Sequence, residues 1–236
     1  MTRTRGRARW RAPPTARSGI ATAPPPPPSS NRLRAVVFDF GGVLWDMRWE
    51  VARELDSAHG LPRSSVFETL YRSAAWHDVE RGTGDRAAWW EGAHRSLEER
   101  AGRQLPRLHE EWRRAQRTIQ VNVDLVKALR LDYKLSILSN ADLTLRERLR
   151  DELGIHHLFD DVVCSAEVGM AKPEPAVFSL ACDRLRLTPS ECVFVDDYEP
   201  NVKAAQEIGM SAVLFRVDRG DDLRAQLRAL GVAPRS

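Results

Sequence analysis

The chain has 236 residues, of which 42% are hydrophobic and 29% charged, a composition typical of a globular protein. This length allows one large domain, or a core domain with a smaller insert. No run approaches the roughly 18 apolar residues that a membrane span needs. We therefore expect no membrane partner.

The first 34 residues contain eight arginines and no acid, so the net charge of +3 hides a charge of −5 on the remainder. Residues 1–33 also hold a run of five prolines and almost no aliphatic side chains, which is too little apolar surface to fold. We expect a disordered Arg/Pro-rich tail there. A passive extension, a transit peptide and a nucleic-acid arm all fit such a composition, with nucleic acid an unlikely partner.

Cys164, Cys182 and Cys192 lie in or beside apolar runs, with no CxxC pair and no matching histidine spacing. This pattern indicates reduced, mostly buried thiols and no zinc site. It favours a cytoplasmic protein.

The first predicted strand, 35–38, is followed by a long stretch with no second strand pattern. Residues 46–121 show about four helices, with Gly60 ending one, Ser64 or Ser65 capping the next and Asp85 capping 86–102; a further helix covers 105–119. Five of the seven tryptophans lie in this stretch, which is typical of a helical core, although one of Trp89 and Trp90 is free to face a substrate. We expect a helical cap domain at 47–121 and a core domain at 34–46 and 122–236.

After the insert, apolar runs alternate with helical patterns. The predicted strands are 135–138, 162–164, 192–195 and 212–215, and the predicted helices are 122–131, 143–153, 174–185, 200–209 and 221–230. Continuous apolar runs separated by helices predict an α/β fold, a doubly wound, Rossmann-like parallel sheet covered on both faces.

Polar residues follow four of the predicted strands. These residues are Asp39, then Ser139 with Asn140, then Lys172 in GMAKPEP, then Asp196 with Asp197. Ligands bind beyond the carboxyl ends of parallel strands, so we expect these groups to converge in one crevice, with Lys172 reaching it from a loop. Each residue alone is commonly a turn or cap, but all four in order predict a site.

The set suits phosphoryl transfer. Asp39 and Asp197 are hard oxygen ligands for Mg²⁺, and Asp39 is placed to attack phosphorus and form an aspartyl phosphate. Lys172, Ser139 and Asn140 would hold the phosphoryl oxygens as charge shifts.

From Arg34 to about Leu230 the sequence resembles the haloacid dehalogenase superfamily, in its phosphatase-like branch with a helical cap after the first strand. The resemblance implies Asp39 as nucleophile and metal ligand, a Mg²⁺ ligand from the Gly41 carbonyl, and Asp197 as a direct ligand. It also implies the second-motif pair Ser139 and Asn140, the third-motif Lys172, and a supporting Asp196, with Asn201 shaping the same loop.

Gly41 departs from the commonest pattern of that family, which has a second aspartate there as general acid and base. Losing such a group costs about 10²- to 10⁴-fold in rate. Another group then supplies the proton, with Asp46 as one candidate, or the substrate has a good leaving group such as an anomeric or aryl oxygen, or the protein is a weak phosphatase.

We therefore expect a Mg²⁺-dependent hydrolase of small phosphate monoesters whose cap opens and closes over the site. Dehalogenation is the first alternative, although the Asp196–Asp197 pair beside Asp39 calls for a cation. A weakly active or non-catalytic binding module is the second. The sequence names neither the substrate alcohol nor the oligomeric state, and the residues expected to set specificity are Trp45, Arg48, Trp76, Arg81 and Trp89.

Overall fold

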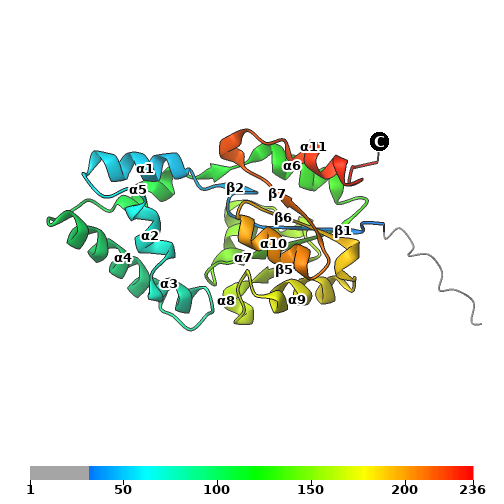
Figure 1. The fold of residues 1–236 in the computed structure, drawn as a ribbon, viewed down its shortest axis with the longest axis horizontal. Helices are drawn as coiled ribbons and strands as arrows, with labels where there is room; N and C mark the ends of the chain where they lie inside the picture. The colour runs from blue at the N-terminus through cyan, green and yellow to red at the C-terminus, as the bar shows by residue number, and fades with distance from the viewer. Residues whose placement is uncertain (1–31, 236) are drawn as a thin grey trace, which may run out of the picture. The chain divides into compact units, whose positions relative to one another are not determined.

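The computed structural model describes residues 32–235, so the tail predicted at 1–33 lies almost entirely outside the described residues. Five parallel strands form the central sheet in the order β5-β4-β1-β6-β7 (Figure 1). They are β1 (Ala35–Phe38), β4 (Lys134–Ser139), β5 (Asp161–Cys164), β6 (Cys192–Asp196) and β7 (Ser211–Leu214). The chain runs outward from β1 to β5, then returns to β6 and β7, which confirms the predicted doubly wound sheet.

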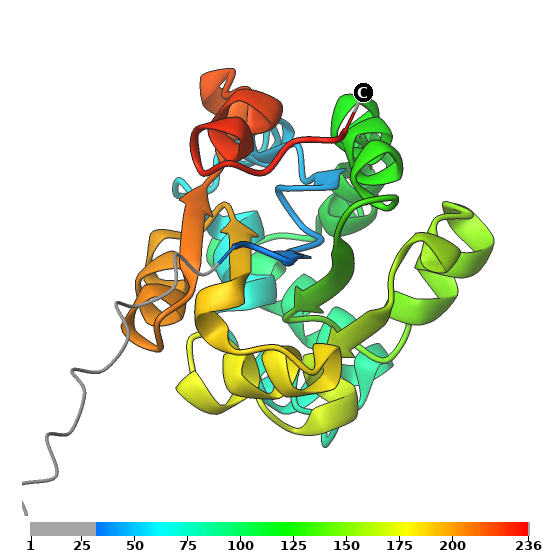
Figure 2. The same cartoon turned by 90° about the vertical axis from the view of Figure 1, so that its right-hand side faces the viewer.

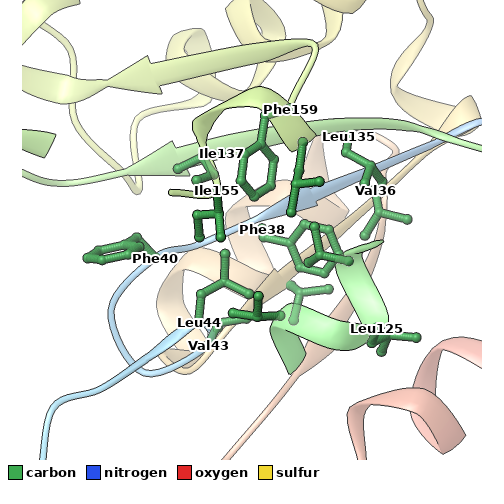
Figure 3. Packing of buried hydrophobic residues seen from close by; sticks show 14 of the residues in the cluster. Val36, Phe38, Phe40, Val43, Leu44, Leu125, Leu135, Ile137, Ile155 and Phe159 are labelled. Carbon is green, nitrogen blue, oxygen red and sulfur yellow. The ribbon is translucent and has the colours of Figure 1, made fainter. Parts of the chain in front are cut away.

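Alternate residues of β1 face opposite layers of the fold, because side chains along a strand point to alternate sides. Val36 and Phe38 pack into one buried cluster, where Figure 3 shows them with Leu135 and Ile137 of β4. Ala35 and Val37 pack into a second cluster on the other face. A central strand buried on both faces therefore consists of continuous apolar residues.

Helices cover both faces of the sheet (Figure 2). The layer on the Phe38 face holds α6 (Gln120–Leu129), α7 (Leu145–Glu147), the π-helical turn η1 (Arg148–Glu152) and α11 (Leu223–Ala229). The layer on the Val37 face holds α9 (Pro175–Leu185) and α10 (Glu199–Glu207). Short turns complete the core: η2 (His156–Leu158), α8 (Ser165–Val168), η3 (Pro189–Glu191) and η4 (Val217–Arg219).

The helical cap lies between two very short strands. It contains α1 (Trp49–Ala58), α2 (Ser65–Tyr71), α3 (Ala74–Val79), α4 (Arg86–Ala101) and α5 (Leu108–Ala115), flanked by β2 (Trp45–Asp46) and β3 (Arg117–Thr118). The prediction of about four helices and no strand was wrong on both counts. Strands of two residues are too short to give a pattern, and β2 and β3 form only because they pair with each other.

Helix caps in this region were predicted with mixed success. The Asp85 side chain accepts a hydrogen bond from the Ala88 N–H and caps α4 as expected. Ser64 precedes α2 but its side chain makes no capping bond. Instead Asp56, from α1, accepts a 2.9 Å hydrogen bond from the Val66 N–H, a long-range cap that local sequence does not reveal.

Aromatic side chains form the centre of the cap, as predicted. Trp49 stacks on Trp112 with ring centroids 4.9 Å apart, and Trp76 and Trp89 lie 4.8 Å apart. Trp89 is buried and Trp90 is only partly buried, but both line a cavity of the cap, so the neighbouring pair does not divide between core and cavity. All three cysteines are buried, and no helix in residues 32–235 is long and apolar enough to cross a membrane.

Burial of His109 makes the cap sensitive to acid. His109 on α5 is 2% exposed, its Nε2 lies 3.0 Å from the Thr69 hydroxyl, and burial lowers its pKa to about 4. The unfolded chain binds a proton near the ordinary histidine pKa of about 6.5, so acid favours unfolding.

Between pH 7 and pH 5, the unfolding free energy of the wild type should fall by about 2 kcal/mol more than that of His109→Gln. Urea titrations at the two pH values measure this difference. His157→Gln, on the exposed surface, should keep the wild-type pH dependence. Equal slopes for wild type and His109→Gln would show that His109 does not carry the effect.

Candidate active site

Asp39 stands directly after β1, at the point where the strand order reverses between β1 and β6. Its backbone N–H donates to the Val195 carbonyl of β6 at 2.8 Å, and its Oδ1 accepts a 2.6 Å hydrogen bond from the Phe40 N–H. Burial raises the pKa of Asp39 to about 6, against the lowering effect of Lys172. The carboxylate is therefore held rigidly at the edge where ligands bind in open parallel sheets.

Lys172 bridges two of the carboxylates predicted for the site. Its Nζ lies 3.0 Å from Asp39 Oδ1 and 2.6 Å from Asp196 Oδ2. The lysine is 5% exposed and Asp196 is fully buried. Burial alone would lower the pKa of Lys172, but the two carboxylates outweigh burial and raise it, so the ammonium stays charged.

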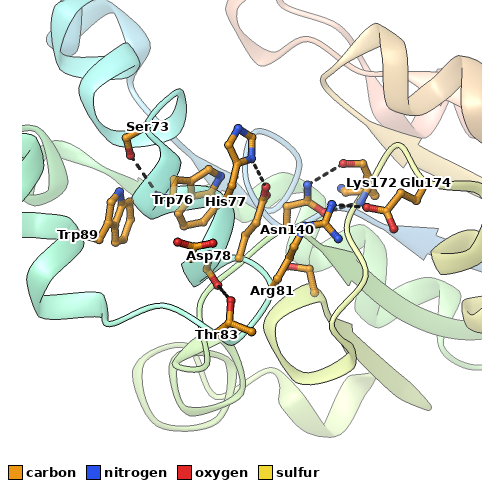
Figure 4. Close-up of polar contacts among 12 residues, drawn as sticks. Ser73, Trp76, His77, Asp78, Arg81, Thr83, Trp89, Asn140, Lys172 and Glu174 are labelled. Carbon is orange, nitrogen blue, oxygen red and sulfur yellow. Dashed lines mark hydrogen bonds and ion pairs between the residues drawn. The ribbon is translucent and has the colours of Figure 1, made fainter.

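Asn140 positions the backbone of Lys172. Its Nδ2 donates to the Lys172 carbonyl at 2.9 Å, and its Oδ1 accepts from the Lys172 N–H at 2.8 Å (Figure 4). Ser139, the last residue of β4, is buried and lines a cavity together with Asp39. The structure thus brings Ser139, Asn140 and Lys172 to the Asp39 end of the sheet.

Three carboxylates gather at this point. Asp39, Asp196 and Asp197 each have an oxygen within 4.8 Å of the others, a spacing that could hold a metal ion. Both oxygens of Asp196 already accept hydrogen bonds from Asn201 Nδ2 at 3.1 Å. Burial, followed by the charges of Asp39 and Asp196, raises the pKa of Asp197 to about 8. Lys172 contacts two of the three carboxylates, and neither its charge nor that of Arg216 offsets the burial and repulsion that disfavour the charged form of Asp197.

Gly42 allows the closest approach in the site. Its φ is +76°, and a Cβ there would lie 2.1 Å from Asp197 Oδ2. Gly41 is different, because a Cβ there would meet only the Met47 sulfur, at 3.5 Å. Space therefore requires glycine at position 42 and permits a side chain at position 41.

Two cavities meet at Asp39. The larger, about 850 Å³, is lined by Asp39, Gly41, Lys172 and Asp197 of the core and by cap residues that include Trp76 and His77. The smaller, about 130 Å³, extends from Asp39 and Ser139 toward the tryptophans of the cap. Gly41 and Asn140 line both cavities. Of the predicted site residues, only Asp196, which is buried, and Ser139, which lines the smaller cavity, do not line the larger cleft.

The residues expected to set specificity divide into two groups. Trp76 lines both cavities and Trp89 lines the smaller one. Trp45, Arg48 and Arg81 line neither, because they are used in structural contacts. Trp45 donates to Gln116 at 3.0 Å, Arg48 pairs with Glu50, and Arg81 pairs with Glu174. Asp46 lines the larger cleft but lies 3.4 Å from Arg117 and accepts the Arg48 N–H.

Cap and core touch beside the site. Arg81 pairs with Glu174, two residues from Lys172 (Figure 4), and Arg86 pairs with Asp142 at 2.9 Å. Gly82 lies against the Ala166 carbonyl so closely that a Cβ would lie 2.1 Å from that oxygen. These contacts hold the tryptophan-rich side of the cap over Asp39.

Sequence reasoning missed two arginines of the smaller cavity, Arg113 and Arg148. One signal was present for Arg148, since it shares a helical stretch with the buried Leu145 and Leu149, and a charge beside an apolar stripe is unusual. Arg113 gave no such signal, because α5 is rich in charged residues throughout.

Comparison with known proteins shows which family the chain resembles. A family model described as haloacid dehalogenase-like hydrolase matches residues 33–209. The chain belongs to this family.

Other members of the haloacid dehalogenase-like family carry different activities. Bifunctional epoxide hydrolase 2 of Sus scrofa is 30% identical over 85% of this chain and 39% of that protein. This chain thus spans about two-fifths of the length of the bifunctional epoxide hydrolases that it matches. A phosphorylated carbohydrates phosphatase of Thermotoga maritima is 26% identical over 85% of this chain and 93% of its own length.

Solved structures of the family share the fold. A family enzyme of Bacteroides thetaiotaomicron, crystallised with magnesium and inorganic phosphate, matches with a TM-score of 0.63 and 23% identity, over 83% of this chain and 100% of that one. An L-2-haloacid dehalogenase matches with a TM-score of 0.53 and 26% identity, over 76% of this chain and 83% of that one. The fold therefore does not distinguish phosphatase from dehalogenase.

The three-carboxylate cluster could hold a metal ion, and Gly42→Ala should weaken its binding of Mg²⁺ as a test ion by at least about tenfold, because the new methyl group displaces Asp197. Strain at positive φ should also cost about 1 to 2 kcal/mol of stability. Calorimetric titration with Mg²⁺ and urea unfolding measure the two effects.

Gly60→Ala is a control that separates the backbone strain at positive φ from the displacement of Asp197. Gly60 has φ +68° and nothing within 4 Å of an added Cβ, so its variant should lose similar stability and bind Mg²⁺ like the wild type. Wild-type affinity in Gly42→Ala would contradict the role given to this contact.

Proposed function

We propose that this protein hydrolyses small phosphate monoesters with Mg²⁺, through an aspartyl phosphate on Asp39. The observation that carries the proposal is the charge at the site, where Asp39, Asp196 and Asp197 converge within 4.8 Å around a single lysine. A divalent cation would neutralise this excess. The named activity of the Thermotoga relative supports phosphate esters of small molecules.

The donor set fits Mg²⁺. Asp39 and Asp197 would hold it, with the Gly41 carbonyl as a third ligand, because Asp196 is fully buried and already accepts from Lys172, Tyr198 and Asn201. Mg²⁺ prefers hard oxygen donors, and proteins usually bind it through only one or two carboxylates. When bound, Mg²⁺ would offset the repulsion between nucleophile and phosphate.

The chain's own residues would carry the chemistry. A carboxylate oxygen of Asp39 attacks phosphorus, and the bond from phosphorus to the ester oxygen breaks, so that the leaving oxygen departs as an anion and takes a proton from water. Lys172, with Ser139 and the amide of Asn140, stabilises the charge on the phosphoryl oxygens. Water then hydrolyses the aspartyl phosphate, releases inorganic phosphate and restores Asp39.

Protonation of the alcohol is the step that Gly41 leaves without a dedicated group. Asp46, the candidate substitute, accepts the Arg48 N–H through Oδ1 and lies 3.4 Å from Arg117 through Oδ2, so both of its oxygens are already engaged. We therefore expect substrates whose leaving oxygen is stable as an anion, such as aryl or anomeric phosphates.

Dehalogenation remains the alternative chemistry for this fold. It also begins with attack by the first-strand aspartate, but on carbon and with no metal. The uncompensated charge of Asp196 and Asp197 beside Asp39 favours the metal-dependent reaction.

Hydrolysis of 4-nitrophenyl phosphate should require both Mg²⁺ and Asp39. Asp39→Asn should lower kcat by at least about 10³-fold, because the amide cannot act as nucleophile. Asp124→Asn, the same change on the exposed surface of α6, should leave the rate within about threefold.

Other results of this assay would favour a different function. Turnover without Mg²⁺ would remove the metal from the proposal. Release of halide from 2-chloropropionate, together with no phosphatase activity, would favour dehalogenation. Inactivity on both substrate classes would favour a binding module.

Gly41→Asp should restore a general acid. An Asp there has room, since the Cβ contacts only Met47. The variant should raise kcat on alkyl phosphates by about tenfold or more, with a smaller change on aryl phosphates. Gly41→Asn, equal in size but unable to donate an acidic proton, should give no such gain. An unchanged alkyl-to-aryl ratio in Gly41→Asp would show that the missing acid does not limit the reaction.

A further inference from the structure

The smaller cavity beside Asp39 has aromatic walls and is also lined by side chains that donate hydrogen bonds. Its volume of about 130 Å³ is below the roughly 300 to 1,000 Å³ of pockets for drug-sized ligands. Tyr71, Trp76, Trp89, Trp90 and Trp112 form its apolar walls. A small organic group attached to the phosphate on Asp39 would occupy this space.

Arg148 of η1 is fixed in the wall of this cavity. Its guanidinium lies 5.0 Å from the Phe40 ring centroid and 5.2 Å from that of Trp45. Its Nε is buried and has no hydrogen-bond acceptor within residues 32–235, although Glu152 lies 3.5 Å away in an ion pair. Glu152 therefore takes part of the charge of Arg148 without accepting a hydrogen bond from its Nε, so the guanidinium can still donate to an oxyanion.

Arg113 of α5 adds a second positive charge. Its guanidinium packs 6.0 Å from the Trp90 ring centroid, and no carboxylate pairs with it in the described part of the chain. Both arginines line the same cavity, and burial, followed by repulsion from Arg113, lowers the pKa of Arg148. The buried Trp90 Nε1 also lacks an acceptor among the described residues.

The other charged groups of the cavity are already paired. Asp142 lies 2.9 Å from Arg86 and accepts from the Thr144 hydroxyl, and Asp39 pairs with Lys172. Gln116 accepts from Trp45 through its Oε1, which leaves its amide nitrogen as a further donor. Donors without acceptors, rather than acceptors without donors, therefore characterise the cavity.

We propose that Arg113 and Arg148 bind an oxyanion on the leaving group, so that the substrate is a small, flat phosphate ester with a second negative charge. This inference rests on the proposed function for the position of the ester. The oxyanion is a carboxylate or a tetrahedral group such as a second phosphate. The aromatic walls would contact the body of the leaving group between the two charges.

Binding of the leaving group alone tests the inference without turnover. Isothermal titration of the full chain, without Mg²⁺, would use phenol, 4-hydroxybenzoate and 4-hydroxybenzenesulfonate, which share a ring and differ in charge. For the wild type, at least one of the two anions should bind about tenfold tighter than phenol or better. The benzoate tests for a carboxylate, and the sulfonate for a tetrahedral oxyanion.

Two variants and a control test whether Arg113 and Arg148 cause the preference for the anions over phenol. Arg148→Gln and Arg113→Gln should each reduce the preference for the anion to about threefold or less. Arg150→Gln, on the same helical stretch but exposed and paired with Asp151, should keep it. Thermal melting checks that each variant is folded, and Arg113→Gln carries the test if Arg148→Gln is unstable.

Equal binding of phenol and both anions by the wild type would overturn the inference, as would a full preference for the anion in Arg113→Gln or in folded Arg148→Gln. Neither result depends on phosphatase activity. Failure of the proposed function would appear only in the hydrolysis assay, so the two failures are distinguishable.

Discussion

Three carboxylates gather at the carboxyl edge of the sheet, two of them paired with one buried lysine, and the rest of the site depends on this arrangement. Lys172 lies 3.0 Å from Asp39 and 2.6 Å from Asp196, in an environment where an unpaired charge would be strongly unfavourable. Its ammonium balances only part of the charge, and Asp197 adds more. The cluster could therefore hold a metal ion, and Asp39 is held in place by contacts within the protein.

The surrounding fold keeps these charges together. Adjacent strands β1 and β6 fix Asp39 beside Asp196, and Asn140 holds the Lys172 backbone with two hydrogen bonds. Gly42 leaves room for Asp197, because no side chain fits between them. These contacts leave little freedom in the choice of residue, whereas position 41 beside them has space for a larger side chain. The absence of an acid at position 41 is thus a chemical feature and not a steric requirement.

The cap gives the site two sides of different character. One cleft carries the acidic cluster and suits a metal with a phosphate. The smaller cavity is lined by Arg113, Arg148 and six aromatic side chains, and suits an anionic organic group. Asp39 lies where the two meet, so a single ester would extend from one to the other. In this arrangement the core would recognise the phosphate, and the cap would select what is attached to it.

The sequence by itself determined the parallel sheet and the order of its polar residues. Buried strands need continuous apolar runs, and residues after such strands meet at one edge, so Asp39, Ser139, Lys172 and Asp196 could be brought together without coordinates. Only the tertiary structure decided the pairing of β2 with β3, the capping of α2 by Asp56, and the placing of Arg113 and Arg148 in the wall of one cavity. Each of these depends on residues far apart in the chain, and local periodicity carries no information about such contacts.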